Sequence, residues 1–488
     1  MKKYITIILS LALTLQLFNS CGSDYLETDY HGGVDINIAL TSVDNIQTAL
    51  SGTYYRLFDY RFAGNYATSI GDIPTDLTYW NTSTGHWNNI YTYRFTDTDT
   101  YLSNIWTFGY KVIDNSARII KASKELYEES SDSDKTRLDR IIAEAYALRG
   151  YAMLTMVNIY GHQVKVKGND FSSTLGMVLA EEPILPFTNV ERATVGDTYQ
   201  SIISDFNNSL QYFEKFDNAD REKCYFTAPA VKGLLARTYL YLEKWDEASE
   251  KALEAIEDSG LTMIYTATQY KALYNGGSSN TESIFYLAID ANTNWSANSC
   301  GTLWSTYSFS PSPKLFGLYS DNDIRLTIMD LNENAPVVPT YKSGKFGAFS
   351  TGNPANATNY LVNIPEMYLI AAEGYINLDN LNKAAEILLN VSKRNSDISS
   401  VSDLPTTKEE LYSFLKEERA RELFQEGLRL WDLRRWDESA QVYAYDYPNI
   451  AFRYNDYKIS DLLFPIPASE INANFGVVQN EWSSTLPQ

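Results

Sequence analysis

Four segments of the chain place apolar residues at intervals of three and four, the spacing that collects them on one face of an α-helix. These segments are residues 43–59, 104–128, 134–160 and 197–214. The pattern predicts a helix in each of them. The first half of the chain is therefore expected to be mostly helical.

Residues 227–257 carry a sharper helical pattern, with small residues where two helices would have to approach closely. Their spacing matches the first and second helices of a tetratricopeptide repeat. The matching positions are Leu235, Ala236, Tyr239, Ala248 and Ala255. Residues 227–257 are therefore predicted to form two antiparallel helices.

A second copy of this pattern runs through residues 367–391, with Ala372, Tyr375 and Ala384 in the same relation. The two copies lie several repeat lengths apart, so they do not form a regular array of adjacent repeats. We interpret them as a few helix pairs that form a scaffold, with long excursions between them. Generic helical hairpins are the alternative.

Two long segments, residues 71–103 and 275–360, interrupt the helical pattern and are rich in Asn, Thr, Ser, Gly and aromatic residues. Four prolines disfavour helix in the second segment: Pro311, Pro313, Pro336 and Pro339. Residues 283–289 form its clearest strand-like run. Because long loops in compact proteins are more often functional than idle, these segments are predicted to carry a binding site.

Residues 419–436 read RARELFQEGLRLWDLRRW and are predicted to form one helical stretch. Phe424, Leu428 and Trp431 fall on one face, at steps of four and three. Opposite charges three or four positions apart are expected to pair along the flanks. The expected pairs are Glu417–Arg421, Glu418–Arg421, Glu426–Arg429 and Asp432–Arg435. We interpret the segment as a salt-bridged helix packed on a larger core.

The first 20 residues combine Lys2 and Lys3 with an apolar run from Ile5 to Phe18, a pattern typical of an export signal. The run is too short for a membrane-spanning helix. It ends in LFNSC, which resembles a bacterial lipoprotein cleavage box, so Cys21 is the predicted lipidation site. An ordinary secretory signal beside a coincidental cysteine is the alternative. Acyl chains on Cys21 would suffice to hold the protein at a membrane.

The composition narrows the classes of ligand. The net charge is −21, which argues against nucleic acid as a partner and favours a neutral substrate. The 37 tyrosines and 9 tryptophans suit half-hydrated surfaces that contact ligands, although many must belong to the core. The three histidines are far apart and the three cysteines form no metal-binding pair, so we predict no metal site and no cofactor. The sequence leaves open whether Cys224 and Cys300 pair.

Together with the 419–436 segment, three further segments resemble the SusD/RagB family of nutrient-binding outer-membrane lipoproteins. EAYALRGYAMLTMVNIYG (144–161) resembles the family's first long tetratricopeptide helix. YLVNIPEMYLIAAEGYINL (360–378) resembles its Arg-x-Ala-Glu-like helix, without the usual basic residue. FPIPASEINANFGVVQN (464–480) resembles its C-terminal Phe-Pro-Ile-Pro-x-x-Glu-Ile run, and departs from it at Phe475 and at Glu481 just beyond.

The resemblance implies a mostly α, SusD-like scaffold of tetratricopeptide-like helix pairs, with long loop-rich ligand-binding excursions and few short strands. Residues 21–488 are expected to form a single domain. Its helical part would reach about residue 260, a loop-rich insertion would cover 261–360, and the family signature would fill 361–488. The resemblance further implies a lipid-anchored, surface-exposed outer-membrane protein that passes oligosaccharides or polysaccharides to a SusC-like TonB-dependent transporter. Such proteins bind without catalysis, and some members take peptides instead.

Aromatic residues in the two loop segments are the candidate ligand contacts. Flat rings hold the C–H face of a sugar, and Asn or Asp side chains hold its hydroxyls. The predicted ligand-binding residues are Tyr79, Trp80, Asn81, Trp87, Tyr91, Trp295, Trp304 and Tyr307. Further polar candidates are Asp76, Asn88, Asn89, Asn292, Asn294 and Asn298. For each tryptophan the alternative is a structural role in packing the loops.

Two other functions remain open from the sequence. No nucleophile elbow, phosphate loop, HExxH or dinucleotide motif occurs, so we predict no enzyme, although two catalytic carboxylates could be chosen from 61 acidic residues. A tetratricopeptide scaffold that binds only proteins is the other alternative. It would leave the aromatic loops with no role beyond packing.

Overall fold

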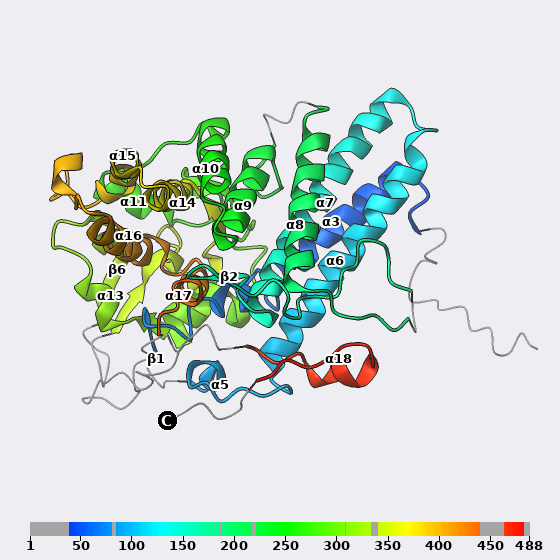
Figure 1. Cartoon of the computed structure of the whole chain (residues 1–488), viewed down its shortest axis with the longest axis horizontal. Helices are drawn as coiled ribbons and strands as arrows, with labels where there is room; N and C mark the ends of the chain where they lie inside the picture. The colour runs from blue at the N-terminus through cyan, green and yellow to red at the C-terminus, as the bar shows by residue number, and fades with distance from the viewer. Residues whose placement is uncertain are drawn as a thin grey trace, which may run out of the picture.

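The computed structural model describes residues 39–80, 84–185, 188–216, 221–307, 309–332, 340–439 and 463–482. The predicted export signal and Cys21 lie outside these residues. Within them the chain is mostly helical, with short two-stranded antiparallel sheets (Figure 1). The predicted fold class is therefore confirmed. No described helix has the length and apolar character needed to cross a membrane.

Four N-terminal helices gather at one end of the molecule (Figure 1). They are α3 (Val43–Phe58), α6 (Thr100–Tyr127), α7 (Asp132–Tyr160) and α8 (Val195–Phe213). A polar residue before each helix accepts a hydrogen bond from a backbone N–H of its first turn: Ser42, Asp99, Ser131 and Thr194. These caps fix where the helices begin, because they satisfy N–H groups that have no partner inside the helix. All four predicted helices are present.

The two predicted helix pairs are also present and lie side by side. They are α9 (Ala228–Tyr241) with α10 (Trp245–Ser259), and α14 (Ile364–Asn377) with α15 (Leu381–Ser392). Helices α10 and α14 pack so closely that a Cβ atom on Gly374 would lie 2.0 Å from Ser249 Oγ. The pairs are distant in sequence but continuous in space, as the scaffold interpretation expects.

The prediction of one helix over 419–436 is wrong. The segment divides into α16 (Lys408–Leu423) and α17 (Arg429–Arg435), because Gln425 and Gly427 take positive φ angles of 65° and 75°. A Cβ atom on Gly427 would lie 2.4 Å from the carbonyl oxygen of Thr68, so this turn requires glycine. The turn is held from outside the segment by Asp72, whose carboxylate accepts from the backbone N–H groups of Gly427 and Arg429 at 2.8 and 3.4 Å.

The charges of this segment pair differently from the prediction in one case. Arg421 reaches Glu417 and Glu418, and Arg435 reaches Asp432, as expected. The predicted Glu426–Arg429 pair does not form, because the turn separates the two side chains. Glu426 pairs with Lys345, and Arg429 with Asp76 at 2.8 Å.

The remaining elements are short. The small helices are α4 (Tyr66–Ser69), α5 (Asn88–Tyr91), α11 (Ala267–Leu273), α12 (Cys300–Thr302), α13 (Pro313–Gly317) and α18 (Ala468–Ala473), and Leu303–Tyr307 forms a π-helix. The paired strands are β1 (Thr78–Trp80) with β5 (Phe309–Pro311), β2 (Lys165–Val166) with β3 (Asn169–Asp170), β4 (Ser283–Tyr286) with β8 (Tyr360–Asn363), and β6 (Met329–Asn332) with β7 (Thr340–Ser343). The strand-like run at 283–289 thus forms β4, and β1–β5 joins the two loop segments.

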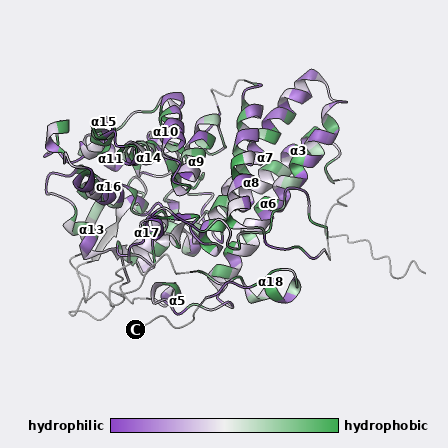
Figure 2. Ribbon diagram, in the orientation of Figure 1, coloured by the Kyte–Doolittle hydropathy of each residue, from purple (hydrophilic) through white to green (hydrophobic). Residues whose placement is uncertain are grey.

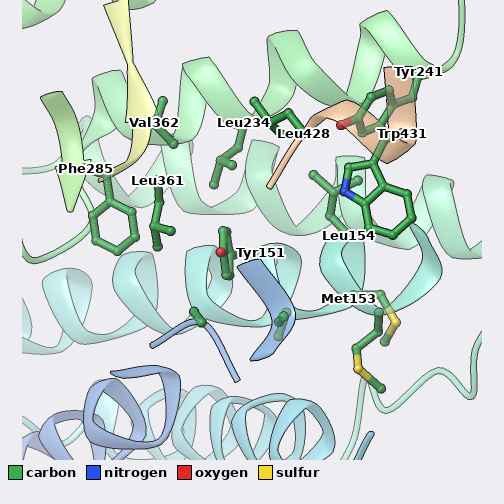
Figure 3. Packing of buried hydrophobic residues seen from close by; sticks show 14 of the residues in the cluster. Tyr151, Met153, Leu154, Leu234, Tyr241, Phe285, Leu361, Val362, Leu428 and Trp431 are labelled. Carbon is green, nitrogen blue, oxygen red and sulfur yellow. The ribbon is translucent and has the colours of Figure 1, made fainter. Parts of the chain in front are cut away.

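The core runs between the N-terminal helices and the C-terminal elements. The helices alternate polar and apolar residues (Figure 2), and their apolar faces contribute to one large buried cluster. Figure 3 shows Trp431 beside Leu154 and Tyr241, which come from α7 and α9. Trp431 therefore packs helices from both halves of the chain together.

Asp72 and Asp76 lie four positions apart in the sequence. Their contributions to the stability of the protein are expected to change with pH in opposite directions. Burial raises the pKa of Asp72 to about 7, and Glu426 adds to the effect. Burial alone would also raise the pKa of Asp76, but Arg429 and Lys314 lower it to about 2. Because the pKa of Asp72 is higher in the folded than in the unfolded protein, stability is lost as the pH rises from about 4 to 7. Because the pKa of Asp76 is lower in the folded protein, its contribution to stability is lost as the pH falls.

Asp72→Asn removes the buried charge but replaces one of the two accepting oxygens with an NH2 group, so its free energy of unfolding should gain on that of the unaltered protein as the pH rises from 4 to 8. The gain should shrink towards pH 4, where the native aspartic acid is already protonated. Asp76→Asn is the matched control and should destabilise the protein at pH 8, with a smaller loss in acid. Urea unfolding at pH 4, 6 and 8 measures both. A pH-independent effect of Asp72→Asn would contradict the assignment.

Candidate functional site

The predicted ligand residues divide by exposure. Five rings are buried: Tyr79, Trp80, Trp87, Tyr91 and Trp304. Two rings, Trp295 and Tyr307, are half-buried and reach the surface. Asn81 lies outside the described residues.

The buried rings have partners within the protein. Trp87 stacks on Tyr101 with ring centroids 4.1 Å apart, and it meets Tyr66 edge-on at 5.4 Å. Trp80 donates its indole N–H to the carbonyl of Thr84 at 3.2 Å. Such contacts favour a packing role for the five rings, so the surface-reaching residues define the candidate site.

Trp295 stands among three aromatic side chains from α3 and the residues that follow it. Its ring centroid lies 5.8, 5.3 and 5.5 Å from those of Tyr55, Phe58 and Tyr60. The indole N–H donates to the carbonyl of Phe58 at 2.9 Å, which fixes the orientation of the ring. Tyr55 is 53% exposed, so this group of rings is open to solvent on one side.

Tyr307 forms a second exposed ring pair, with His86. The rings are stacked, with centroids 5.1 Å apart and planes inclined by 16°. Tyr307 ends the π-helix, an insertion geometry that is frequent at functional sites. His86 is exposed and directly precedes the buried Trp87.

Further tyrosines extend the Trp295 group to Trp87, the residue that follows His86 in the chain. Tyr60 contacts Tyr66 at 5.4 Å, Tyr66 contacts Tyr101 at 4.9 Å, and Trp87 lies against both Tyr66 and Tyr101. We call the exposed and half-buried members the aromatic strip: Tyr55, Phe58, Tyr60, Tyr66, His86, Tyr101, Trp295 and Tyr307. The sequence reasoning found Trp295 and Tyr307 and missed the others; Tyr55 and Phe58, for example, belong to a region assigned only to a helix.

Polar groups border the aromatic strip. Asn294 donates to the carbonyl of Asp290 at 2.9 Å, and Asn292 and Asn298 are exposed nearby in sequence. Arg61 forms two 2.8 Å hydrogen bonds with Asp59 while its guanidinium lies 5.1 Å from the Tyr60 ring centroid. Asp76 is fully buried between Arg429 and Lys314, which places it in the interior.

The arrangement is suited to binding by stacking and hydrogen bonding. Surface-reaching rings hold apolar faces, and neighbouring amides and hydroxyls hold polar edges. No three His, Cys, Asp or Glu side chains among the described residues are placed to share a metal ion. Cys224 and Cys300 are free thiols, and burial raises the pKa of the Cys300 thiol to about 12, so it is a poor nucleophile.

The fold is a scaffold of packed helix pairs, and comparisons with known proteins identify its family. A model described as the SusD family matches residues 329–482, and one described as starch-binding associating with outer membrane matches residues 34–240. The chain belongs to the SusD/RagB family. No match was found among curated protein sequences.

Solved structures share the fold over nearly the whole chain. A SusD superfamily protein from Bacteroides thetaiotaomicron is 22% identical, with a TM-score of 0.80, and the match covers 90% of this chain and 99% of that one. A protein from Bacteroides vulgatus, named as sugar-binding, is 24% identical with a TM-score of 0.79, covering 91% and 99%. At these identities the likeness shows the fold.

Proposed function

We propose that this protein binds oligosaccharides or polysaccharides on the aromatic strip and does so without catalysis. The observation that carries the proposal is the group of surface-reaching rings around Trp295, whose indole N–H is held by its hydrogen bond to the carbonyl of Phe58. A fixed ring binds a sugar face at a low entropic cost, because its orientation is set before the ligand arrives. Two family descriptions support a carbohydrate ligand: the starch-binding model and the structural relative named as sugar-binding.

The proposal includes the location and the partner of the protein. A lipid on Cys21 would anchor it in the outer membrane with residues 21–488 as a single surface-exposed domain. A SusC-like TonB-dependent transporter would then receive the captured glycan. The family model described as associating with the outer membrane supports this location.

Trp295→Ala is expected to weaken glycan binding by at least about tenfold, which corresponds to about 1.4 kcal/mol. Its melting temperature should fall far less than that of a variant at a fully enclosed tryptophan, because this ring is only partly buried. Affinity electrophoresis of residues 22–488 against plant, fungal, bacterial and host polysaccharides would first name the ligand. Calorimetry with that ligand would then measure the variant.

Tyr265→Ala is the matched control, because Tyr265 is 42% exposed and bonds to Asn390 on α15, away from the aromatic strip. It should bind glycan as the unaltered protein does. Unchanged affinity in Trp295→Ala would remove the aromatic strip from the binding site. Binding of peptides, with no retardation by any polysaccharide, would replace the glycan by a peptide ligand.

A further inference from the structure

Positive charges adjoin the aromatic strip where the end of α3 packs against α6. The guanidinium carbon of Arg61 lies 5.1 Å from the ring centroid of Tyr60, a member of the strip. The same carbon lies 3.8 Å from the ring centroid of Phe108 on α6, and the ammonium of Lys111 lies 4.3 Å from that centroid. The two cations are therefore separated by no more than the sum of these two distances, about 8 Å.

Arg56, in the last turn of α3, adds a third positive charge. Arg56 and Arg61 both lower the pKa of Lys111, so their charges lie close enough to act on its ammonium. We call Arg56, Arg61 and Lys111 the cationic group; all three side chains reach the surface. Lys111 is exposed and forms no hydrogen bond or ion pair with any described residue. Like charges held together repel one another, and a bound anion would relieve that repulsion.

The neighbouring carboxylates do not neutralise the cationic group. Asp59 is the only described carboxylate that raises the pKa of Lys111, and it accepts two 2.8 Å hydrogen bonds from Arg61. Asp114, one turn further along α6, pairs with Arg118 at 2.7 Å. Each carboxylate thus has its own arginine, and the other two members of the cationic group remain as an excess of positive charge among the described residues. The net charge of −21 favours a neutral ligand for the chain as a whole, but the charge beside the aromatic strip is positive.

The pair with Asp59 also orients the guanidinium of Arg61. Its Nε and Nη2 atoms donate to the Asp59 carboxylate, which is 1% exposed, so the group is fixed before any ligand arrives. Its Nη1 atom donates to no described residue, and the side chain is 32% exposed. A guanidinium edge beside an ammonium is a strong donor set for carboxylate or sulfate oxygens. The adjoining ring of Tyr60 offers a face for a sugar.

We propose that the glycan bound on the aromatic strip carries an anionic substituent, a carboxylate or a sulfate ester, that the cationic group holds. This inference rests on the proposed carbohydrate function and specifies the class of its ligand. Sugar rings stack on Tyr60 and Trp295, while the substituent accepts from Arg61 Nη1 and from the ammonium of Lys111. Uronic-acid glycans and sulfated glycans share the charge and the acceptor oxygens that this arrangement recognises.

The test uses two pairs of polymers that share a backbone and differ in charge. The pairs are polygalacturonate with its fully methyl-esterified form, and dextran sulfate with dextran. Calorimetric titration of residues 22–488 should show tighter binding of at least one charged polymer than of its neutral counterpart. The pair that shows the difference identifies the substituent as a carboxylate or a sulfate. Added salt should weaken binding of the charged polymer, because the cationic group lies at the surface.

Lys111→Met should weaken binding of the charged polymer about threefold, and Arg56→Met combined with Lys111→Met about tenfold, without changing retention by neutral polysaccharides. Neither residue bonds to another described residue, so the melting temperatures should not fall. Lys383→Met is the matched control, because it removes one charge from α15, where Lys383 is 47% exposed. Arg61 is kept in all variants, since its removal would leave Asp59 buried without its partner.

The proposal is overturned if neither charged polymer binds more tightly than its neutral counterpart, or if the variants of the cationic group bind it as Lys383→Met does. Trp295→Ala measures the aromatic strip separately. Weaker binding in Trp295→Ala, with no effect of Lys111→Met or of the double variant, would uphold the strip and overturn the anionic ligand. Binding of the charged polymer that depends on Lys111 but not on Trp295 would uphold the anion site and reject the proposed role of the aromatic strip.

Discussion

Replacing Trp304 with alanine is expected to lower the free energy of unfolding by about 3–5 kcal/mol, the usual cost of removing a large buried aromatic ring. Trp304 is 3% exposed, and its ring meets Phe309 at 5.8 Å, Phe346 at 6.5 Å and Phe424 at 5.5 Å. These neighbours come from β5, from a short 3-10 helix (Gly344–Phe346) and from the residue that follows α16. The ring therefore packs the loop-rich segment against the family signature, and its loss leaves a cavity there.

Chemical denaturation measures this change, and Trp295→Ala provides the comparison. Both tryptophans lie in the same loop segment, yet only Trp304 is enclosed, so its substitution should cost far more stability. Trp304→Phe should restore most of the loss, because it refills much of the cavity. Wild-type stability in Trp304→Ala, together with lost glycan binding, would return Trp304 to the ligand site.

The contrast between these two residues shows what the sequence could not decide. Both are tryptophans amid Asn, Ser and Thr, and local composition treats them alike. Their exposure depends on partners far along the chain: Trp304 meets Phe424, whereas Trp295 lies on Phe58. Tyr79 and Trp80 are similarly enclosed because β1 pairs with β5, more than 200 residues later. The aromatic ligand site stays a prediction, and residue types alone could not show which of its rings reach the surface.

The helices were more accessible to prediction, because their periodicity and caps are local. The helix pairs α9–α10 and α14–α15 were found from small residues at fixed spacing, and Ala236, Ala248 and Ala384 of that pattern are fully buried. The break within 419–436 was missed because Gly427 is its only clear local signal and the contacts that hold the turn are remote. Apolar spacing continues through Phe424 and Leu428, while Asp72 and Thr68 hold the turn from the other end of the chain.

Glu373 on α14 pairs with Arg435 of the 419–436 segment. Glu373→Ala should destabilise the protein by about 3–5 kcal/mol, the usual cost of breaking a buried ion pair. Three helices meet on this carboxylate. Arg435 of α17 donates to it, at 2.7 Å for Nη2, Tyr412 of α16 donates at 3.0 Å, and the Trp436 indole donates at 3.2 Å. Glu373 is fully buried on α14, so its removal leaves a guanidinium without its main partner in the interior.

Denaturant unfolding of three variants separates the buried pair from ordinary charge effects. Asp44→Ala removes a carboxylate that also meets an arginine, Arg137 at 2.6 Å, but is 84% exposed, and it should behave almost as the unaltered protein. Glu373→Ala combined with Arg435→Met should cost less than the two single losses added, because no unpaired charge then remains buried. A Glu373→Ala loss as small as that of Asp44→Ala would mean that water reaches Arg435. The signature segment would then stabilise the junction of α14, α16 and α17 through its apolar contacts rather than through its charges.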